Sequence, residues 1–282
     1  MRTRFAPSPT GLLHLGHAYS AMLAHDRATA IGGTMVLRIE DTDSTRVRPE
    51  YAAAITEDLG WLGLDWERPT LRQSDHLADY DAALERLIAA GVCYPCICTR
   101  GDIQAALSAP QEGAAQVSHD GGLYPGICRA RPVADRGPGD AIRLDMRRAL
   151  TVVGKTALWF DETGPDHAGR HMLDARHLIA TTGDVVLARR DIGAASYHLA
   201  VVVDDARQGI TEVIRGTDLF EATFLHRLLQ DLLELHTPSY HHHRLIRDES
   251  GKRLAKRDDA RAIRKYRENG ATPQDIRRLV GL

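Results

Sequence analysis

The sequence predicts an α/β fold with a parallel sheet, because strand-like and helix-like segments alternate from the N-terminus onward. Residues 2–6 and 34–39 have the character of short strands, and the second segment is rich in apolar and β-branched residues. Between and after them, helices are expected at 16–31, 49–60 and 79–91. This order favours a sheet of the Rossmann type, in which helices connect neighbouring parallel strands.

The middle of the chain has a different composition and predicts an insertion. Residues 93–140 are rich in Gly, Pro, Ala and Ser, so we expect something other than an apolar core to hold them. Short strands at 141–144 and 151–153 are expected where the fold resumes. The later segments are apolar runs at 185–188 and 200–203, a strand at 211–214, a helix at 217–235 and two short helices within the last 40 residues.

These segments predict four parts of the chain. Residues 1–92 and 182–240 form the two halves of the Rossmann domain, and the insertion at 93–181 lies between them. A basic and helical region follows at 241–282. From Arg244 onward the chain contains 12 Lys and Arg against 6 Asp and Glu, a local excess of six positive charges. Such a tail is compatible with a phosphate-docking surface and equally with a solvated helical face.

The overall composition is that of an ordinary globular protein. Of the 282 residues, 43% are hydrophobic and 26% are charged. The formal net charge of −2 gives no electrostatic argument for nucleic acid over the chain as a whole. The N-terminus has no apolar signal region, and no apolar run approaches the roughly 20 residues of a transmembrane helix. We therefore expect a cytoplasmic protein without a membrane partner.

A pattern typical of phosphate binding follows the first strand. The strand ends in RFAPSPTG at 4–11, and HLGH at 14–17 begins the next helix. Free N–H groups and the positive end of a helix dipole point outward at such a junction. Gly16 allows a nucleotide to approach the backbone, and His14 and His17 can donate hydrogen bonds to phosphate oxygens. The HLGH tetrad alone is also compatible with two surface histidines near a helix cap.

The complete run at 4–17 resembles the HIGH signature of class I aminoacyl-tRNA synthetases, in the form used by the glutamyl and glutaminyl group. Far downstream, GKRLAKR at 251–257 is similar to the mobile KMSKS loop of the same class, although an ordinary basic loop has the same composition. The resemblance places Arg253 and Lys256 at the two lysine positions. Ala255 stands at the serine position, so any contact of a serine hydroxyl is lost here.

The resemblance implies that the chain binds ATP with Mg²⁺. The ATP site would consist of His14, Gly16, His17, Arg253 and Lys256. Three of these, His14, His17 and Lys256, would be catalytic, and Lys256 would contact the pyrophosphate leaving group.

The same resemblance implies a site for L-glutamate. Stretches at 197–205 and 212–218 are similar to those that border the amino-acid site in the family, and Glu40 takes the position that contacts the substrate ammonium. The implied pocket consists of Arg4, Ser8, Glu40, Tyr197 and Arg215. Glutamate carries two carboxylates and one ammonium, and the planar fork of arginine suits a carboxylate. Either arginine taken alone is also compatible with a structural ion pair.

Cysteines at both ends of a weakly apolar segment suggest a metal site. Cys96 and Cys98 lie before this segment, and a Y-x-x-x-C pattern, Tyr124 to Cys128, follows it. Three thiolates and a fourth donor suit tetrahedral zinc. The set resembles the zinc site of glutamyl-queuosine tRNA(Asp) synthetases, which implies a structural Zn²⁺ held by Cys96, Cys98, Tyr124 and Cys128. Cys93 would either replace one ligand or pack in the core.

The extent of the resemblance, from Arg4 to about Lys256, favours one branch of the class. Discriminating glutamyl-tRNA synthetases carry a large C-terminal anticodon-binding region, for which the residues after 257 leave no room. The shorter relatives resemble the catalytic half alone, activate glutamate without RNA and transfer it to queuosine in the anticodon of tRNA(Asp). The implied partners of this chain, expected to be a monomer, are therefore L-glutamate, ATP and tRNA(Asp) carrying queuosine.

Three other functions stay open at this point. A short glutamyl-tRNA synthetase would charge a tRNA 3′ end, and a small-molecule adenylyltransferase shares the H-x-G-H helix start but needs no RNA. An inactive RNA-binding remnant would lack catalysis, which the presence of His14, His17 and Lys256 argues against. If the chain transfers glutamate to tRNA(Asp), the basic tail would hold the anticodon stem. The residues expected to do so are Arg261, Arg264, Lys265 and Arg267.

Overall fold

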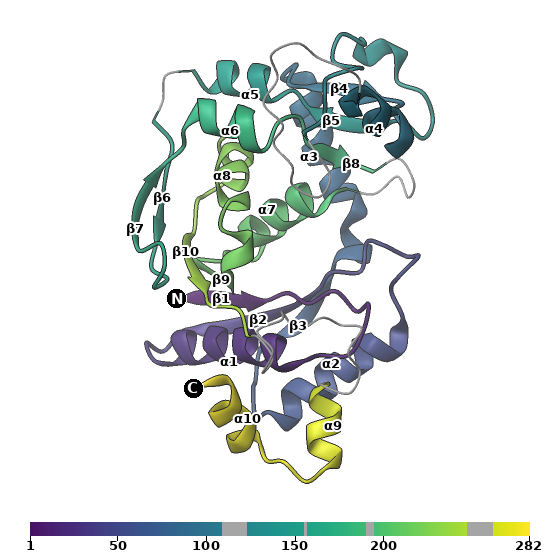
Figure 1. Cartoon of the computed structure of the whole chain (residues 1–282). Coiled ribbons are helices and arrows are strands. Elements are labelled where there is room, and N and C mark those ends of the chain that lie inside the picture. Colours follow the sequence, from purple (N-terminus) through teal and green to yellow (C-terminus); the bar gives the residue numbers. More distant parts are fainter. Residues whose placement is uncertain (109–122, 155–156, 190–194, 247–261) are drawn as a thin grey trace.

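A parallel sheet at the centre of the protein confirms the predicted α/β class (Figure 1). The computed structural model describes residues 1–108, 123–154, 157–189, 195–246 and 262–282. One half of the sheet pairs, in parallel, β1 (Arg2–Phe5), β2 (Thr34–Ile39) and β3 (Glu67–Arg72). The other half pairs, also in parallel, β9 (Glu212–Gly216), β10 (Ser239–His243) and β6 (Trp159–Glu162).

Backbone hydrogen bonding at the N-terminus joins the two halves of the sheet. The carbonyl of Arg2 accepts from the N–H of Thr211 at 2.9 Å, and the Thr211 hydroxyl accepts from the Arg2 N–H at 2.8 Å. β1 therefore lies beside β9, and the strands of the two sheets follow one another in the order β3–β2–β1–β9–β10–β6–β7, where β7 spans Gly169–Met172 (Figure 1). Two segments 209 positions apart become neighbours. Their carboxyl ends meet at one edge, where open α/β sheets bind ligands.

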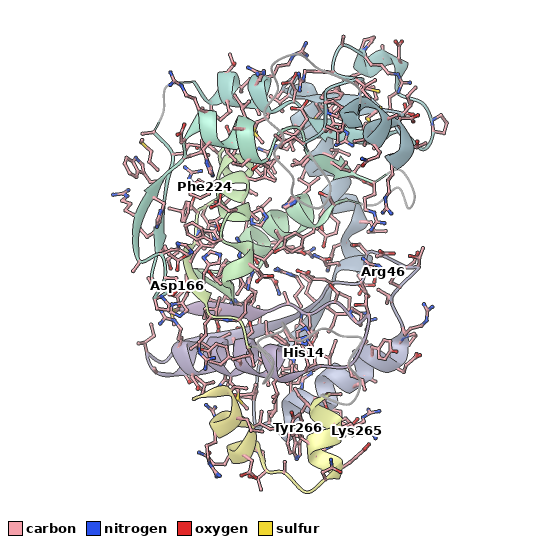
Figure 2. All side chains as sticks on the ribbon, viewed as in Figure 1. His14, Arg46, Asp166, Phe224, Lys265 and Tyr266 are labelled. Atoms are coloured by element: carbon pink, nitrogen blue, oxygen red, sulfur yellow. The ribbon has the colours of Figure 1, made fainter. Side chains whose placement is uncertain are left out.

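One face of the sheet is covered by the N-terminal and C-terminal helices. These are α1 (Leu15–Thr29), α2 (Pro49–Trp61), α9 (Ile263–Glu268) and α10 (Pro273–Val280). Their apolar core includes Met22 of α1, Ile55 of α2 and Ile276 of α10. Tyr266 of α9 packs against it (Figure 2). Thr272 caps α10, and Ile276 and Val280 pack this helix into the core that α1 shares.

The opposite face carries a second, larger core. Its helices are α3 (Leu77–Ala89), α5 (Met146–Val153), α6 (Ala175–Thr181), α7 (Tyr197–Arg207) and α8 (Ala222–Leu232). Leu87, Leu144 and Val201 are buried together in it. Short 3-10 turns span Gln73–His76, Val133–Asp135 and Thr217–Leu219. No helix in the described parts of the chain combines the length and the apolarity needed to cross a bilayer.

A small antiparallel sheet lies above this core, with two strands from the predicted insertion and one that follows it (Figure 1). The sheet pairs β4 (Cys93–Cys96), β5 (Ala141–Leu144) and β8 (Val186–Ala188). Helix α4 (Arg100–Ser108) follows β4. The strand β7 (Gly169–Met172) forms a hairpin with β6, and β6 also pairs with β10. The insertion thus places one strand in the central sheet.

Two predicted elements differ from the structure. The predicted strand at 151–153 is wrong, because these residues end helix α5, which Asp145 caps and whose Met146 and Ala149 are buried. The apolar run at 200–203, which was not assigned to an element, lies in helix α7. The helix predicted over 217–235 is shorter, since the 3-10 turn precedes α8.

Candidate active site

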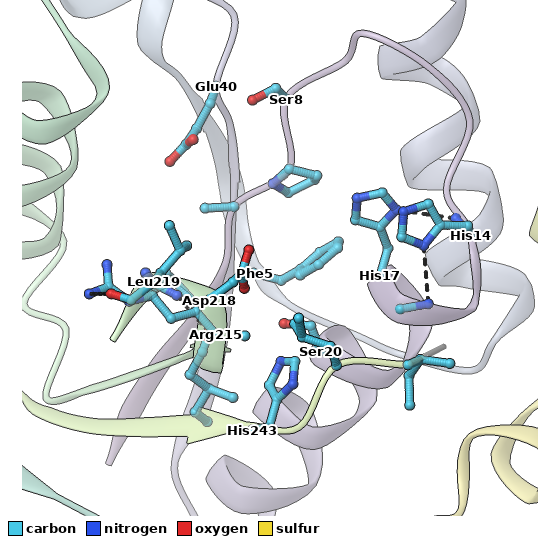
Figure 3. A pocket seen from close by; sticks show the side chains of 18 of the residues that line it. Phe5, Ser8, His14, His17, Ser20, Glu40, Arg215, Asp218, Leu219 and His243 are labelled. Atoms are coloured by element: carbon cyan, nitrogen blue, oxygen red, sulfur yellow. Dashed lines mark hydrogen bonds between the residues drawn. The ribbon is translucent and has the colours of Figure 1, made fainter. Parts of the chain in front are cut away.

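A pocket opens at the carboxyl ends of β1 and β9, at the edge of the central sheet (Figure 3). Its volume of about 390 Å³ is within the range of small-molecule sites. All of the predicted ATP and glutamate residues that the structure describes line it: Arg4, Ser8, His14, Gly16, His17, Glu40, Tyr197 and Arg215. Arg253 and Lys256 lie outside the described residues.

The residues on either side of 247–261 lie next to the pocket. Ile246, the last described residue before it, lines the pocket. Ala262, the first described residue after it, forms a β-bridge with His14, and the Ile263 N–H donates to the Leu13 carbonyl at 2.8 Å. Both ends of the stretch that contains Lys256 are therefore fixed next to the predicted phosphate site.

The two histidines at the start of α1 are held by backbone N–H groups. His14 Nδ1 accepts from the Gly16 N–H, and His17 Nδ1 accepts from the His14 N–H, both at 3.1 Å. The rings stack with 3.8 Å between their centroids. Because each Nδ1 is an acceptor, the proton of each neutral ring is assigned to Nε2. Both side chains can therefore donate a hydrogen bond to an anionic oxygen.

Gly16 lies where a side chain would disturb this arrangement. A Cβ at this position would be 3.0 Å from His14 Cε1 and 3.2 Å from His14 Nδ1. Even alanine would therefore press against the imidazole whose nitrogen accepts from the Gly16 N–H. The glycine therefore allows the His14 ring to lie against the backbone at the start of α1.

A buried charge network fixes one side of the amino-acid pocket. Arg38 is completely buried and contacts the carboxylates of Asp205, at 2.8 Å, and Glu40, at 3.4 Å. Asp205 Oδ1 also accepts from Arg4 Nε at 3.2 Å, and Arg4 Nη1 donates to the Ile214 carbonyl at 2.9 Å. Burial raises the pKa of Glu40, whereas Arg38 and Arg4 lower it. Arg4 Nη2 makes no hydrogen bond to any described residue, so it is available to a ligand.

Arg215 occupies the other side of the pocket and is only 5% exposed. Neutral acceptors surround its guanidinium: His242 Nε2 at 3.0 Å, Tyr197 Oη at 3.3 Å, His226 Nδ1 at 3.1 Å, the Leu219 carbonyl at 3.1 Å and Thr223 Oγ1 at 2.7 Å. No carboxylate among the described residues forms an ion pair with it. The charge of Arg215 acts on Asp205 but is not neutralised by a carboxylate in contact with it, so this position favours an anionic ligand.

Tyr197 and two neutral histidines lie beside Arg215. Tyr197 Oη accepts from Arg215, which leaves the phenol proton available for donation to a ligand in the pocket. His226 Nε2 lies 3.1 Å from His198 Nδ1. Burial and the charge of Arg215 lower the pKa of His198 to about 4 and that of His226 well below its usual value. Both rings are therefore neutral at pH 7, and Arg215 carries the charge of this cluster.

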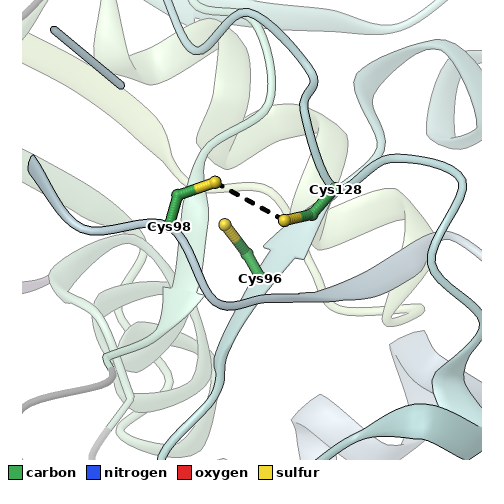
Figure 4. Close-up of side chains that lie close together, drawn as sticks. All are labelled: Cys96, Cys98 and Cys128. Atoms are coloured by element: carbon green, nitrogen blue, oxygen red, sulfur yellow. Dashed lines mark hydrogen bonds between the residues drawn. The ribbon is translucent and has the colours of Figure 1, made fainter. Parts of the chain in front are cut away.

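The predicted cysteines come together in the insertion (Figure 4). The Sγ atoms of Cys96, Cys98 and Cys128 lie within 4.8 Å of one another, and Cys98 Sγ is 3.5 Å from Cys128 Sγ. Tyr124 Oη lies 3.4 Å from two of the sulfurs and accepts from the Cys128 N–H at 2.9 Å. Burial would raise the pKa of Cys96, but hydrogen bonds from Tyr124 and Arg143 lower it. The cluster is therefore a candidate metal centre.

Comparisons with known proteins agree with this geometry. The family model described as "tRNA synthetases class I (E and Q), catalytic domain" matches residues 1–120 and 174–282. A glutamyl-Q tRNA(Asp) synthetase of Rhodobacter capsulatus is 57% identical over the whole of both chains. A protein of the same name from Nocardia farcinica is 40% identical over 98% of this chain and 82% of its own length. The chain belongs to the glutamyl-Q tRNA(Asp) synthetase family.

Solved structures place this glutamyl-Q tRNA(Asp) synthetase family member among the class I enzymes. A glutamate tRNA ligase of Elizabethkingia meningosepticum, in complex with its amino acid, superposes with a TM-score of 0.76 at 27% identity. All of this chain is covered, but it spans only 60% of that ligase and 61% of the one from Elizabethkingia anophelis. Methionyl-tRNA synthetase of Mycobacterium tuberculosis, at 11% identity and a TM-score of 0.60, shares the fold alone.

The sequence motifs do not reveal every residue around the site of this family member. Asp205 lies in the stretch 197–205 and Arg38 in the strand 34–39. Nothing in the sequence indicates that Asp205 contacts both Arg4 and Arg38. His242 is the second of three consecutive histidines on strand β10. No motif in the sequence distinguishes it from its two neighbours. Glu162 lies within 121–173, which the family model leaves unmatched. Cys93 is buried in the larger core, apart from the thiol cluster.

Proposed function

We propose that the chain activates L-glutamate with ATP and transfers it to queuosine in the anticodon of tRNA(Asp). The observation that carries this proposal is the buried Arg215, which has no carboxylate partner among the described residues and lines the same pocket as Arg4 and Glu40. Two cationic groups and one carboxylate suit an amino acid that carries a side-chain carboxylate and an ammonium. The names of the full-length relatives support the same substrate and acceptor.

Activation would occur between the two halves of the pocket. An oxygen of the glutamate α-carboxylate attacks the α-phosphorus of ATP, and the bond to the β-phosphate oxygen breaks. The products are glutamyl-adenylate and pyrophosphate. His14 and His17 donate hydrogen bonds to phosphate oxygens as charge develops, and Lys256 stabilises the leaving pyrophosphate, which Mg²⁺ accompanies as part of the nucleotide substrate. Catalysis then consists of positioning and charge stabilisation.

The substrate groups divide between the two sides of the pocket. Glu40 receives the ammonium, whereas Arg4, Tyr197 and Arg215 receive the side-chain carboxylate, which becomes the counter-ion that Arg215 lacks. Ser8 lies beside Glu40 in the wall of the pocket (Figure 3). In the second step, a hydroxyl of the queuosine cyclopentene ring attacks the carbonyl carbon of the adenylate, and AMP leaves.

A structural zinc ion fits the cysteine cluster. Tetrahedral zinc with bonds of about 2.3 Å requires ligand atoms about 3.8 Å apart. The distances of 3.4 to 3.5 Å among Cys98, Cys128 and Tyr124 are close to that value. We propose Cys96, Cys98, Tyr124 and Cys128 as the ligands. The ion would stabilise the insertion where it has little apolar area to bury.

Exchange of labelled pyrophosphate into ATP tests the activation step without RNA. We expect exchange that depends on glutamate and ATP alone. Transfer of labelled glutamate to tRNA(Asp) with and without queuosine then tests the acceptor. An adenylyltransferase of another class would ignore glutamate, an inactive remnant would give no exchange, and labelling of tRNA(Glu) at its 3′ end would identify a short glutamyl-tRNA synthetase instead.

A further inference from the structure

A carboxylate of the insertion lies behind Arg215. Glu162 is the last residue of β6, and its backbone pairs with β10, the strand that carries His242. Glu162 Oε2 lies 2.5 Å from His242 Nδ1, and His242 Nε2 lies 3.0 Å from Arg215 Nε. All three side chains are buried, with exposures of 3%, 0% and 5%. The three side chains form a continuous chain of hydrogen bonds from β6 to the pocket, called here the Glu162–His242–Arg215 line.

The hydrogen bonds of this line determine where the imidazole proton lies. Arg215 always donates, so His242 Nε2 is an acceptor, and the proton of the neutral ring is on Nδ1. Nδ1–H then donates to Glu162 Oε2. Burial and Arg215 lower the pKa of His242, while Glu162 raises it. Burial alone would raise the pKa of Glu162, but hydrogen bonds from His242 and Gly164 lower it to about 2.

The other carboxylate oxygen is held by two backbone groups. Glu162 Oε1 accepts from the N–H of His242 at 2.9 Å and from the N–H of Gly164 at 2.5 Å. A Cβ on Gly164 would collide with the His242 carbonyl at 2.2 Å and with Glu162 Oε1 at 2.7 Å. The carboxylate therefore has one fixed orientation, which presents Oε2 to the imidazole.

We propose that Glu162 and His242 are positioning residues that hold the guanidinium of Arg215 for the substrate carboxylate. This inference rests on the proposed function of the pocket and adds a part of the insertion to its amino-acid specificity. Glu162 sets the imidazole tautomer, and the imidazole holds Arg215 Nε. Arg215 Nη1 then donates to His226 and to Tyr197, which lines the pocket. Neither residue lines the pocket itself.

The substitution Glu162→Gln tests this arrangement without a change of shape. The amide oxygen would take the Oε1 position, because two backbone N–H groups require an acceptor there. The amide NH₂ would then face Nδ1, which moves the ring proton to Nε2, against the N–H of Arg215 Nε. Two facing donors leave both unsatisfied, so we expect the KM for glutamate in pyrophosphate exchange to rise roughly 10- to 100-fold. The KM for ATP should stay within about twofold.

A matched control separates this role from loss of a buried carboxylate in general. Glu212→Gln makes the same chemical change on the neighbouring strand β9, where Glu212 pairs with Arg27 away from the pocket. We expect this control to lower thermal stability and to leave both KM values unchanged. An equal rise of the KM for glutamate in the two variants, or none in Glu162→Gln, overturns the inference.

If Glu162→Gln does not fold, substitutions of His242 test the same positioning role. His242→Gln retains an acceptor for Arg215 and a donor for Glu162, so its KM for glutamate should stay within about threefold of wild type. His242→Leu keeps most of the volume but no acceptor, and its KM should rise at least about tenfold. Equal KM values for glutamate in these two variants overturn the inference.

The wild-type protein separates failure of this inference from failure of the proposed function. If the wild type shows no glutamate-dependent exchange, the proposed function is wrong as well. If the wild type exchanges and the variants have the wild-type KM for glutamate, only the positioning role is wrong.

Discussion

Arg4 and Asp205 form a buried ion pair, with 3.2 Å between Nε and Oδ1, across 201 positions of sequence. The same oxygen of Asp205 accepts from Arg38, which also contacts Glu40. One aspartate thus connects the cation and the carboxylate that we propose for opposite groups of the substrate. Its negative charge balances two buried guanidinium groups, so both the pocket and the fold depend on it.

Asp205→Asn is expected to destabilise the protein and to weaken glutamate binding. Removal of one partner of a buried ion pair leaves an uncompensated charge and costs roughly 3 kcal/mol of unfolding free energy. Urea denaturation monitored by circular dichroism measures this loss. Asp65→Asn is the control, because the Asp65 side chain is 94% exposed and its pair with His25 should contribute less than about 1 kcal/mol. Equal stability of the two variants would contradict the assignment.

The buried histidines beside Arg215 predict loss of stability in mild acid. The pKa of His198 is about 4 in the folded protein and 6.5 in the unfolded chain. The unfolded chain therefore binds more protons between these values, and stability falls as the pH decreases from 6.5 to 4. This one group contributes up to about 3 kcal/mol. Unfolding midpoints in urea from pH 7.5 to about 4 should show the decline, and His198→Gln should reduce its slope.

The thiol cluster predicts one bound zinc per chain and a graded response to substitution. Cys128→Ser should abolish binding and lower the melting temperature, because the insertion loses its cross-link. Tyr124→Phe keeps the ring that packs under Arg143 but removes Oη, so zinc affinity should fall by about 10-fold or more. Zinc content by atomic absorption and competition with a chelating dye measure both. Cys93→Ala, in the core, should keep full zinc content despite reduced stability.

Gly16→Ala should impair ATP use more than glutamate binding. The new Cβ would press on His14 at 3.0 Å and occupy the surface that faces the nucleotide. We expect the kcat/KM for ATP in pyrophosphate exchange to fall about 10-fold, which corresponds to about 1.4 kcal/mol. Gly60→Ala is the matched control, since no atom lies within 4 Å of its Cβ position in helix α2. That variant should be fully active and up to about 1 kcal/mol more stable.

The basic tail predicts a separation of RNA transfer from adenylate formation. Arg264 and Arg267 of α9 both pair with the exposed Glu57, at 3.2 and 2.8 Å. Exposed pairs are weak, so RNA phosphates can replace this carboxylate. Charge reversal of both arginines should weaken glutamate transfer to tRNA(Asp) and preserve RNA-independent exchange. Glu57→Gln, which releases both arginines, should preserve transfer; equal loss of both activities in the charge-reversed variant would refute an RNA contact.

Much of the pocket was predictable because its residues stand in short, ordered motifs. The run around His14 and the residues Glu40, Tyr197 and Arg215 each border a strand or a helix end, where parallel topology brings side chains together. The alternation of elements in the first 90 residues predicted their sheet for the same reason. Lys256 remains a prediction, since it lies outside the described residues.

The supporting contacts were not predictable, because they arise from pairing between distant segments. Glu162 has no motif around it, and its approach to His242 depends on β6 entering the sheet beside β10. Helix α5 was misjudged because the β-branched residues at 151–153 outweigh, in a short window, the capping by Asp145. Local patterns therefore identify the groups that face a substrate better than those that hold them in place.

The position of β6 limits how freely the insertion can be exchanged between relatives. Residues 121–173 are unmatched by the family model, yet β6 supplies Glu162 to the line that ends at Arg215. If Glu162 positions Arg215 as we propose, a chimaera that takes this segment from another enzyme would also receive a determinant of amino-acid choice. Modular boundaries drawn from sequence alignment would thus cut through a functional unit.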